Sequence, residues 1–145
     1  RTTTPTVFRL LVAMSCLCAG PALAASPLDG AWRLESGTYV DAEGREKDYG
    51  SLKLHGTKLH DVPDSVVWRI VATAQGDRFW AAGSGRFTAN ADTYVETPEI
   101  ASYPVADGGS YRFRYTLVGD TWTLERYEGG KRVEREVWRR AAAIP

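Results

Sequence analysis

Two carboxylates in this sequence alternate with aromatic side chains, and they have the clearest potential for chemistry. Glu96 lies two residues after Tyr94, and Glu136 lies two residues before Trp138 and four before Arg140. Residues two apart in an extended strand face the same side. Because an unpaired carboxylate in an apolar interior costs several kcal/mol, these groups need partners. One hypothesis is an inward network of Glu96, Glu136 and Arg140 that orients the polar head of a ligand.

A structural role is the alternative for the same residues. Arg140 can cap the ring of Trp32 through a cation–π contact, and the pattern favours this role for Arg140. The two glutamates would then tie strand ends together, and the sequence does not choose between their two roles. A weaker alternative is a barrel enzyme in which Glu96 and Glu136 act as acid and base.

The remaining sequence offers one further candidate for catalysis. Ser84 is the only serine flanked by two glycines, Gly83 and Gly85, but the Gly-x-Ser-x-Gly spacing of a strand-to-helix nucleophile is missing. This stretch also lacks the third glycine and the following helix of a nucleotide-binding loop. A bulge or tight turn explains these glycines better. We therefore expect a protein that is not an enzyme.

The sequence contains two histidines, His55 and His60. Their separation of five positions would place them on opposite faces of a single strand, and lone histidines usually lie at the surface. The two cysteines, Cys16 and Cys18, lie in a segment that we expect to be removed, so a structural zinc site lacks its usual ligands. We expect no metal and no cofactor, with haem iron bound by one histidine as a minor alternative.

The first 24 residues have the layout of a secretory signal peptide. Arg1 and Arg9 are followed by an apolar run over residues 10–18 and by the small-residue site Ala22-Leu23-Ala24. The run is shorter than the roughly 20 apolar residues that cross a bilayer. We therefore expect a signal peptide over residues 1–24, a folded domain over residues 25–145, and an exported protein that is periplasmic or secreted.

The charge of the expected mature chain is close to balanced. Removing Arg1 and Arg9 leaves 16 basic residues against 18 acidic ones, a net charge of about −2. Such a charge gives no reason to expect nucleic acid or an anionic membrane as a partner. We also expect neither a disulfide nor a transmembrane segment in the mature protein.

The elements that must position the candidate residues are strands. In the stretch from Tyr111 to Val118, the side chains of Tyr111, Phe113, Tyr115 and Leu117 alternate with polar residues, which is typical of a half-buried strand. From Leu28 onward we find no stretch of ten residues with helical spacing. The predicted strands cover residues 31–39, 51–55, 66–73, 78–82, 85–90, 93–97, 111–118, 121–127 and 132–140. The fold class is therefore all-β, a barrel or a sandwich.

Four stretches of this chain resemble small bacterial secreted lipocalin-like domains of the calycin superfamily. Gly30-Ala31-Trp32 matches the Gly-x-Trp that opens lipocalins, and Trp138-Arg139-Arg140 supplies an arginine that packs across that tryptophan. The pattern extends over residues 85–96 and 111–124 and covers the chain from about residue 28 to 141. The resemblance implies an antiparallel up-and-down barrel of eight to ten strands with room for one small ligand. The chain is shorter than the larger lipocalins and lacks their disulfide and long helix.

Strand parity assigns the interior of such a barrel. Trp32, Leu34 and Ser36 share one face of the first strand, for example. Five tryptophans in a barrel of this size can line a pocket or fill the interior completely. The residues that we expect to contact a ligand are Trp32, Leu34, Trp68, Tyr94, Glu96, Phe113, Tyr115, Trp122, Glu136, Trp138 and Arg140.

The expected function is to hold a small apolar or amphipathic molecule inside an exported barrel. The alternative is a secreted interaction or inhibitor module with a packed barrel. A solid interior together with an exposed apolar patch beside the loop at residues 98–110 would favour that alternative.

Overall fold

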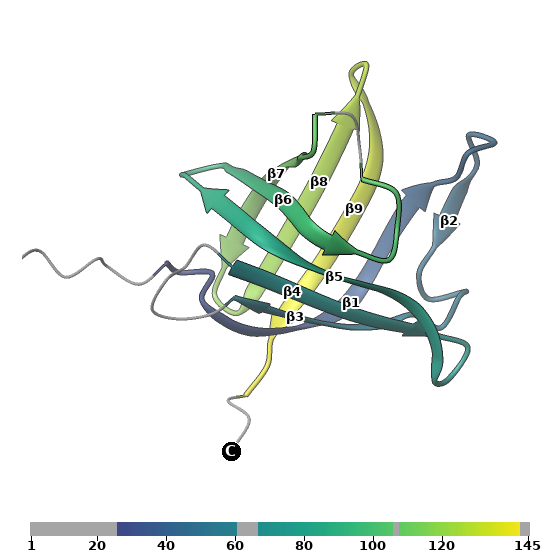
Figure 1. Cartoon of the computed structure of the whole chain (residues 1–145), viewed down its shortest axis with the longest axis horizontal. Coiled ribbons are helices and arrows are strands. Elements are labelled where there is room, and N and C mark those ends of the chain that lie inside the picture. Colours follow the sequence, from purple (N-terminus) through teal and green to yellow (C-terminus); the bar gives the residue numbers. More distant parts are fainter. Residues whose placement is uncertain (1–25, 61–66, 106–107, 143–145) are drawn as a thin grey trace, which may run out of the picture.

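The computed structural model describes residues 26–60, 67–105 and 108–142, so the predicted signal peptide lies outside the described residues. The strands of this part form one antiparallel sheet, and it contains no helix (Figure 1). The strands are β1 (Gly30–Val40), β2 (Glu46–Asp48), β3 (His55–His60), β4 (Val67–Ala74), β5 (Arg78–Ala89), β6 (Thr93–Ala101), β7 (Tyr111–Val118), β8 (Thr121–Glu128) and β9 (Lys131–Arg140).

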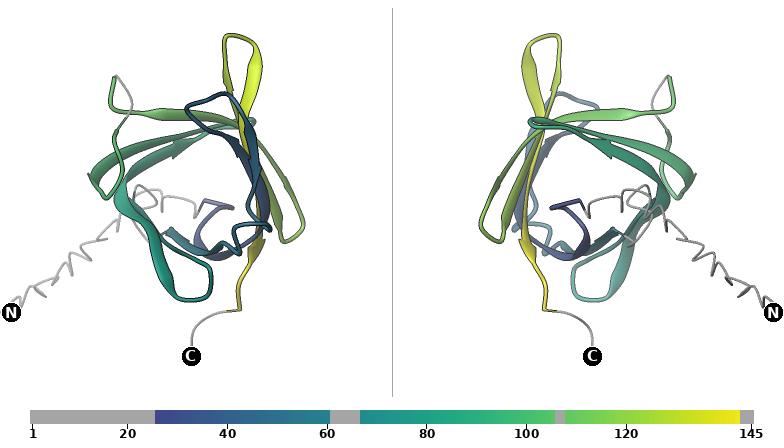
Figure 2. Two further views of the ribbon diagram at one scale, coloured as in Figure 1. Left: turned by 90° about the vertical axis from the view of Figure 1, so that its right-hand side faces the viewer. Right: turned by 90° about the vertical axis from the view of Figure 1, so that its left-hand side faces the viewer.

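The sheet closes on itself through β1. One edge of β1 pairs with β9, and the other edge pairs with β3 near Gly30 and with β2 near Val40. From β3 onward each strand pairs with the next one in the chain, so eight strands form a closed barrel and β2 is an additional ninth strand. Figure 2 shows these strands enclosing a common interior. The predicted all-β, up-and-down antiparallel barrel of eight to ten strands is confirmed.

Most predicted strands match an observed one, and the strand over residues 111–118 has the predicted bounds. The strand predicted over residues 51–55 is wrong, because residues 50–53 form turns and β3 begins at His55. The inward residues of β3 include Lys58 and His60, which are buried although they are polar. Alternation of apolar and polar residues therefore gave no signal for this strand.

The glycines around Ser84 lie inside a strand rather than at a turn between two strands. Strand β5 is continuous, and its pairing with β6 shifts register between Ser84 and Gly85. A Cβ atom on Gly85 would lie 2.2 Å from the backbone oxygen of Thr97. The bulge interpretation is confirmed, since the close approach of β6 leaves room only for glycine.

A second bulge changes which residues of β1 face inward. Leu34 pairs with Trp138, but Ser36 pairs with Val137, so the register shifts across Glu35. Beyond this point the alternation reverses, and Gly37 is buried while Ser36 is exposed. The expectation that Ser36 faces inward is therefore wrong.

Large side chains fill one end of the barrel. They come from the start of β1 and β6, the end of β5 and β9, and neighbouring positions of β7 and β8. The ring centroids of Trp32 and Trp122 lie 5.3 Å apart, and the indole N–H of Trp32 donates to the carbonyl oxygen of Leu28. This core consists of Leu28, Trp32, Phe87, Tyr94, Phe113, Trp122, Leu124 and Trp138.

Arg140 closes the filled end from outside. Its guanidinium carbon lies 4.3 Å from the ring centroid of Trp32, and it donates hydrogen bonds to the carbonyl oxygens of Pro27 and Asp29. The cation–π cap expected from the sequence is present.

Candidate functional site

The other end of the barrel contains a cavity of about 680 Å³. Its lining comes from β1, β3, β6 and β9, from the end of β4 and β8, from the start of β5 and β7, and from the segments just before β3 and after β6. The small residues Gly56, Ala72 and Ala81 contribute to this lining and leave the volume unfilled. The remaining lining residues are Leu34, Tyr39, Val40, Tyr49, Leu54, Lys58, Trp80, Glu96, Tyr103, Pro104, Tyr111, Phe113, Arg126, Glu134, Glu136 and Trp138.

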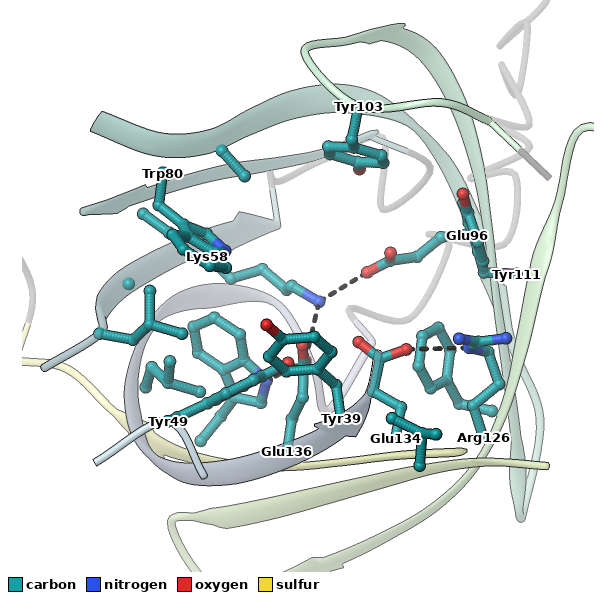
Figure 3. Close-up of a pocket in the computed structure, with 18 of the residues that line it drawn as sticks. Tyr39, Tyr49, Lys58, Trp80, Glu96, Tyr103, Tyr111, Arg126, Glu134 and Glu136 are labelled. Carbon is teal, nitrogen blue, oxygen red and sulfur yellow. Dashed lines mark hydrogen bonds and ion pairs between the residues drawn. The ribbon is translucent and has the colours of Figure 1, made fainter. Parts of the chain in front are cut away.

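Lys58 is the central polar residue of this cavity, where β3 directs its side chain inward (Figure 3). Only 2% of its surface is exposed. Its ammonium nitrogen lies 2.6 Å from Glu96 Oε1 and 3.8 Å from Glu136 Oε2. The same nitrogen lies 4.9 Å from the ring centroid of Trp138. The ammonium is therefore shared by two carboxylates from distant strands, β6 and β9.

A chain of hydrogen bonds connects this ion pair with the filled end of the barrel. Glu96 Oε1 accepts from the hydroxyl of Tyr94 at 2.9 Å, and that hydroxyl lies 2.9 Å from His60 Nε2. On the other side of the imidazole, Nδ1 lies 2.6 Å from the carbonyl oxygen of Leu28, so it must carry the proton and donate. Because the neutral imidazole can then only accept at Nε2, the single hydroxyl proton of Tyr94 serves either Glu96 Oε1 or His60 Nε2. The buried indole N–H of Trp122, beside them, has no hydrogen-bond partner among the described residues.

Burial and neighbouring charges set the protonation of the cluster. Burial by itself lowers the pKa of Lys58, but the carboxylates of Glu96 and Glu136 more than offset this effect and raise that pKa above its usual value. Burial, with a smaller contribution from the charge of Lys58, lowers the pKa of His60 to about 3. At neutral pH Lys58 is therefore charged and His60 is neutral.

Glu136 is the group of this cluster that titrates near neutrality. Burial, together with the negative charges of Glu134 and Glu96, raises its pKa to about 7, although the charge of Lys58 and the hydrogen bond from Trp138 act in the opposite direction. The indole N–H of Trp138 donates to Glu136 Oε2 at 2.7 Å. Glu136 therefore exchanges a proton close to pH 7 inside the cavity.

A second ion pair lies at the edge of the cavity. Arg126 Nε donates to Glu134 Oε2 at 2.8 Å, and Arg126 also contacts Glu128. Its guanidinium carbon lies 5.7 Å from the ring centroid of Tyr111. Tyr49 also lines the cavity, and burial followed by the negative charges of Glu136 and Glu134 raises the pKa of its hydroxyl.

The predicted contact residues fall into separate regions of the barrel. Leu34, Glu96, Phe113, Glu136 and Trp138 line the cavity. The predicted residues in the packed end that do not line the cavity are Trp32, Tyr94 and Trp122, with Tyr115 packed against them and Arg140 outside over Trp32. Trp68 lies in β4, and its side chain lies outside the described residues.

The cation of the inward network differs from the one in the network hypothesis. That hypothesis joined Arg140 to Glu96 and Glu136, but Lys58 occupies that position, and Arg140 lies beyond the filled end in the capping role that the sequence favoured. The expectation that a lone histidine lies at the surface holds for His55 and fails for His60, which is 1% exposed. A buried histidine is tolerated here because the ring is neutral and its Nδ1 donates to the carbonyl oxygen of Leu28.

Sequence reasoning missed a further group of lining residues. Lys58 was missed because β3 was placed too early in the chain, and no apolar periodicity marks it. Tyr111 was correctly placed on the same face as Phe113 but not assigned to the site. The other aromatic or charged lining residues that were missed are Tyr39, Tyr49, Trp80, Tyr103, Arg126 and Glu134.

The described residues show neither a metal centre nor a membrane-spanning helix. No three of their His, Cys, Asp and Glu side chains converge in a way that would hold a metal ion. Likewise, none of the described segments is a helix with the length and hydrophobicity that crossing a bilayer requires.

Comparison with known proteins yields a structural similarity only. No model of a protein family and no curated protein matches this sequence. Among solved structures, the chain is similar to a redesigned beta barrel, with 16% sequence identity and a TM-score of 0.45, over 79% of this chain and 92% of that chain. The barrel assignment rests on the strand pairing of this chain, and the resemblance to lipocalin-like domains stays a prediction.

Replacing Lys58 tests the ion pair. Lys58→Met leaves two buried carboxylates without their cation, so we expect the free energy of unfolding at pH 7 to fall by about 3–5 kcal/mol in chemical denaturation. Lys131→Met, at an exposed lysine in β9, should change it by less than about 0.5 kcal/mol. The double variant Lys58→Met/Glu96→Gln should regain most of the loss. Equal stability of the two lysine variants would contradict the prediction.

Glu136 gives a prediction on pH. Its pKa is about 7 in the folded protein, above its usual 4.5, so the folded state holds this proton more tightly and its contribution to stability is lost as pH rises through 7. His60 acts in the opposite sense below pH 6.5, because its folded pKa is depressed. We therefore expect the difference in free energy of unfolding, Glu136→Gln minus the unmodified protein, to rise by roughly 2.5 kcal/mol from pH 5 to pH 8. A constant difference across this range, measured by chemical denaturation, would show that the carboxyl does not titrate as described.

Proposed function

We propose that this protein binds a small amphipathic molecule in the open half of its barrel. The observation that carries the proposal is the cavity of about 680 Å³, which falls within the range of small-molecule sites. Aromatic and aliphatic side chains form most of its wall, and a few charged groups are gathered around Lys58. Such an arrangement fits a ligand with an apolar body and one polar end.

The proposal includes export of the protein. The support is the sequence pattern of residues 1–24, which lie outside the described residues. Sequencing the N-terminus of protein recovered from the periplasm or the medium tests it, and a chain that still begins before residue 20 would contradict the cleavage.

The interaction-module alternative has partial support. Ile100 and Val105, at the loop where an apolar patch was considered, are 74% and 43% exposed, and Phe79 is 59% exposed. That alternative also needs a solid interior, whereas half of this barrel surrounds a cavity. We therefore favour binding of a small molecule.

A second candidate function is acid–base chemistry on the bound molecule. Glu136 favours it, because its pKa of about 7 suits proton transfer and it faces the cavity beside Lys58. The two functions differ in what happens to the ligand. A molecule that is only bound is recovered from D₂O without deuterium on its carbon atoms. Acid–base catalysis at carbon introduces deuterium there, and Glu136→Gln should abolish this incorporation.

Filling the cavity tests the binding proposal. Gly56 lies on the inward face of β3, and a Cβ atom there would lie 3.4 Å from side-chain atoms of Leu34 and Trp138. We expect Gly56→Leu to occupy cavity space and to weaken binding of the neutral fluorescent probe N-phenyl-1-naphthylamine at least about tenfold.

Thr57→Leu is the matched control, since Thr57 is the next residue of β3 and is exposed. It adds the same side chain outside the barrel and should leave affinity for the probe within about twofold. Equal affinities for Gly56→Leu and Thr57→Leu would place the probe outside the cavity and contradict the proposal.

A further inference from the structure

The charged side chains that line the cavity do not balance. Among the described lining residues there are three carboxylates, Glu96, Glu134 and Glu136, and two cations, Lys58 and Arg126. Both cations are already shared, Lys58 between Glu96 and Glu136, and Arg126 between Glu134 and Glu128. With all of these groups ionised, the cavity carries an excess of negative charge.

Two carboxylate oxygens in the cavity are without a donor. Glu96 uses Oε1 for its contacts with Lys58 and Tyr94, and Glu136 uses Oε2 for those with Trp138 and Lys58. Within the described part of the chain, no donor contacts Glu96 Oε2 or Glu136 Oε1. Both residues are more than nine-tenths buried, at 6% and 8% exposed. Neither oxygen is among the fully enclosed side-chain atoms that lack a partner, so both are accessible from the cavity, where a ligand that donates hydrogen bonds would satisfy them.

The cavity wall also suits a cation. The rings of Tyr39, Tyr49, Trp80, Tyr103 and Tyr111 surround the space next to the carboxylates (Figure 3). The faces of aromatic rings attract positive charge. Lys58 shows the same preference within this protein, since its ammonium lies 5.3 Å from the ring centroid of Trp122 and close to that of Trp138.

We propose that the ligand of this cavity is an amphipathic cation, such as a primary alkylammonium, whose charged end donates to the free carboxylate oxygens of Glu96 and Glu136 and whose apolar body lies against the aromatic wall. This inference rests on the proposed function and specifies the class of ligand. Repulsion from Lys58 and Arg126 opposes such binding, and the three lining carboxylates, when ionised, exceed these two cations by one charge.

The proposal implies a pH dependence of binding. Burial keeps the pKa of Glu136 at about 7, so below that pH the carboxyl is neutral and balances no cation. Affinity for an ammonium should therefore rise with pH up to about 7 and level off above it, while a primary ammonium stays protonated to about pH 10. The charged and titratable groups around Glu136 are Lys58 from β3, Glu96 from β6, Arg126 from β8, Glu134 from β9, and Tyr39, Tyr49, Tyr103 and Tyr111.

Three ligands with the same eight-carbon chain test the charge preference. Octylamine, octanol and octanoate present a cation, a neutral group and an anion at pH 8. Binding is measured by titration calorimetry and by the fluorescence of the cavity tryptophans Trp80 and Trp138. We expect octylamine to bind at least about tenfold more tightly than octanol, and octanoate to bind most weakly.

Glu136→Gln shows whether the carboxylate is responsible. This variant should weaken octylamine binding about tenfold at pH 8, leave octanol binding within about twofold, and abolish the rise in affinity between pH 6 and pH 8. Glu35→Gln, which removes an exposed carboxylate paired with Arg139 outside the barrel, is the matched control and should change none of these values.

The outcomes separate the two proposals. Octanol or octanoate binding as tightly as octylamine would overturn the cation proposal and leave the binding function intact. A loss of octanol affinity equal to that of octylamine in Glu136→Gln would also overturn it, because the carboxyl would then act through packing. Absence of binding by all three ligands, and by the neutral probe, would overturn the binding function itself.

Discussion

The shared contact of the Lys58 ammonium with Glu96 and Glu136 is the interaction on which the interior of this barrel depends. Lys58 is only 2% exposed, and burial of its ammonium group is tolerated because two carboxylates from other strands lie beside it. The hydrogen bonds from Tyr94 and His60 extend the polar cluster to the carbonyl of Leu28. The charged groups of Lys58, Glu96 and Glu136 therefore lie together at the inner end of the cavity.

This cluster also marks the boundary between two differently packed halves. On one side, the rings of Trp32, Trp122 and Tyr94 fill the space that eight strands enclose. On the other side, small residues such as Gly56 and Ala72 stand at inward positions, and the volume stays open. A barrel of this size can be packed or hollow, and here side-chain size makes it packed at one end and hollow at the other.

The excess of carboxylates connects the architecture with the proposed ligand. A purely apolar cavity would favour any apolar molecule, whereas carboxylate oxygens without a hydrogen-bond donor favour a ligand with a positively charged donor. Because Glu136 titrates near pH 7, the group that would select the charge of the proposed ligand would also make its binding depend on pH. The exposed apolar residues Ile100 and Val105, in contrast, take no part in the proposed binding of a small molecule.

The sequence by itself determined the strands whose apolar and polar residues alternate, such as Tyr111 to Val118, and it placed Glu96 and Glu136 on inward faces. It did not find Lys58, because a buried lysine is sensible only beside carboxylates, and Glu96 lies 38 positions further along the chain. It could not place Ser36 correctly, since a bulge at Glu35 reverses the alternation in β1. Alternation is a local property that each strand carries in its own sequence, whereas register and charge pairing exist only after distant strands have met.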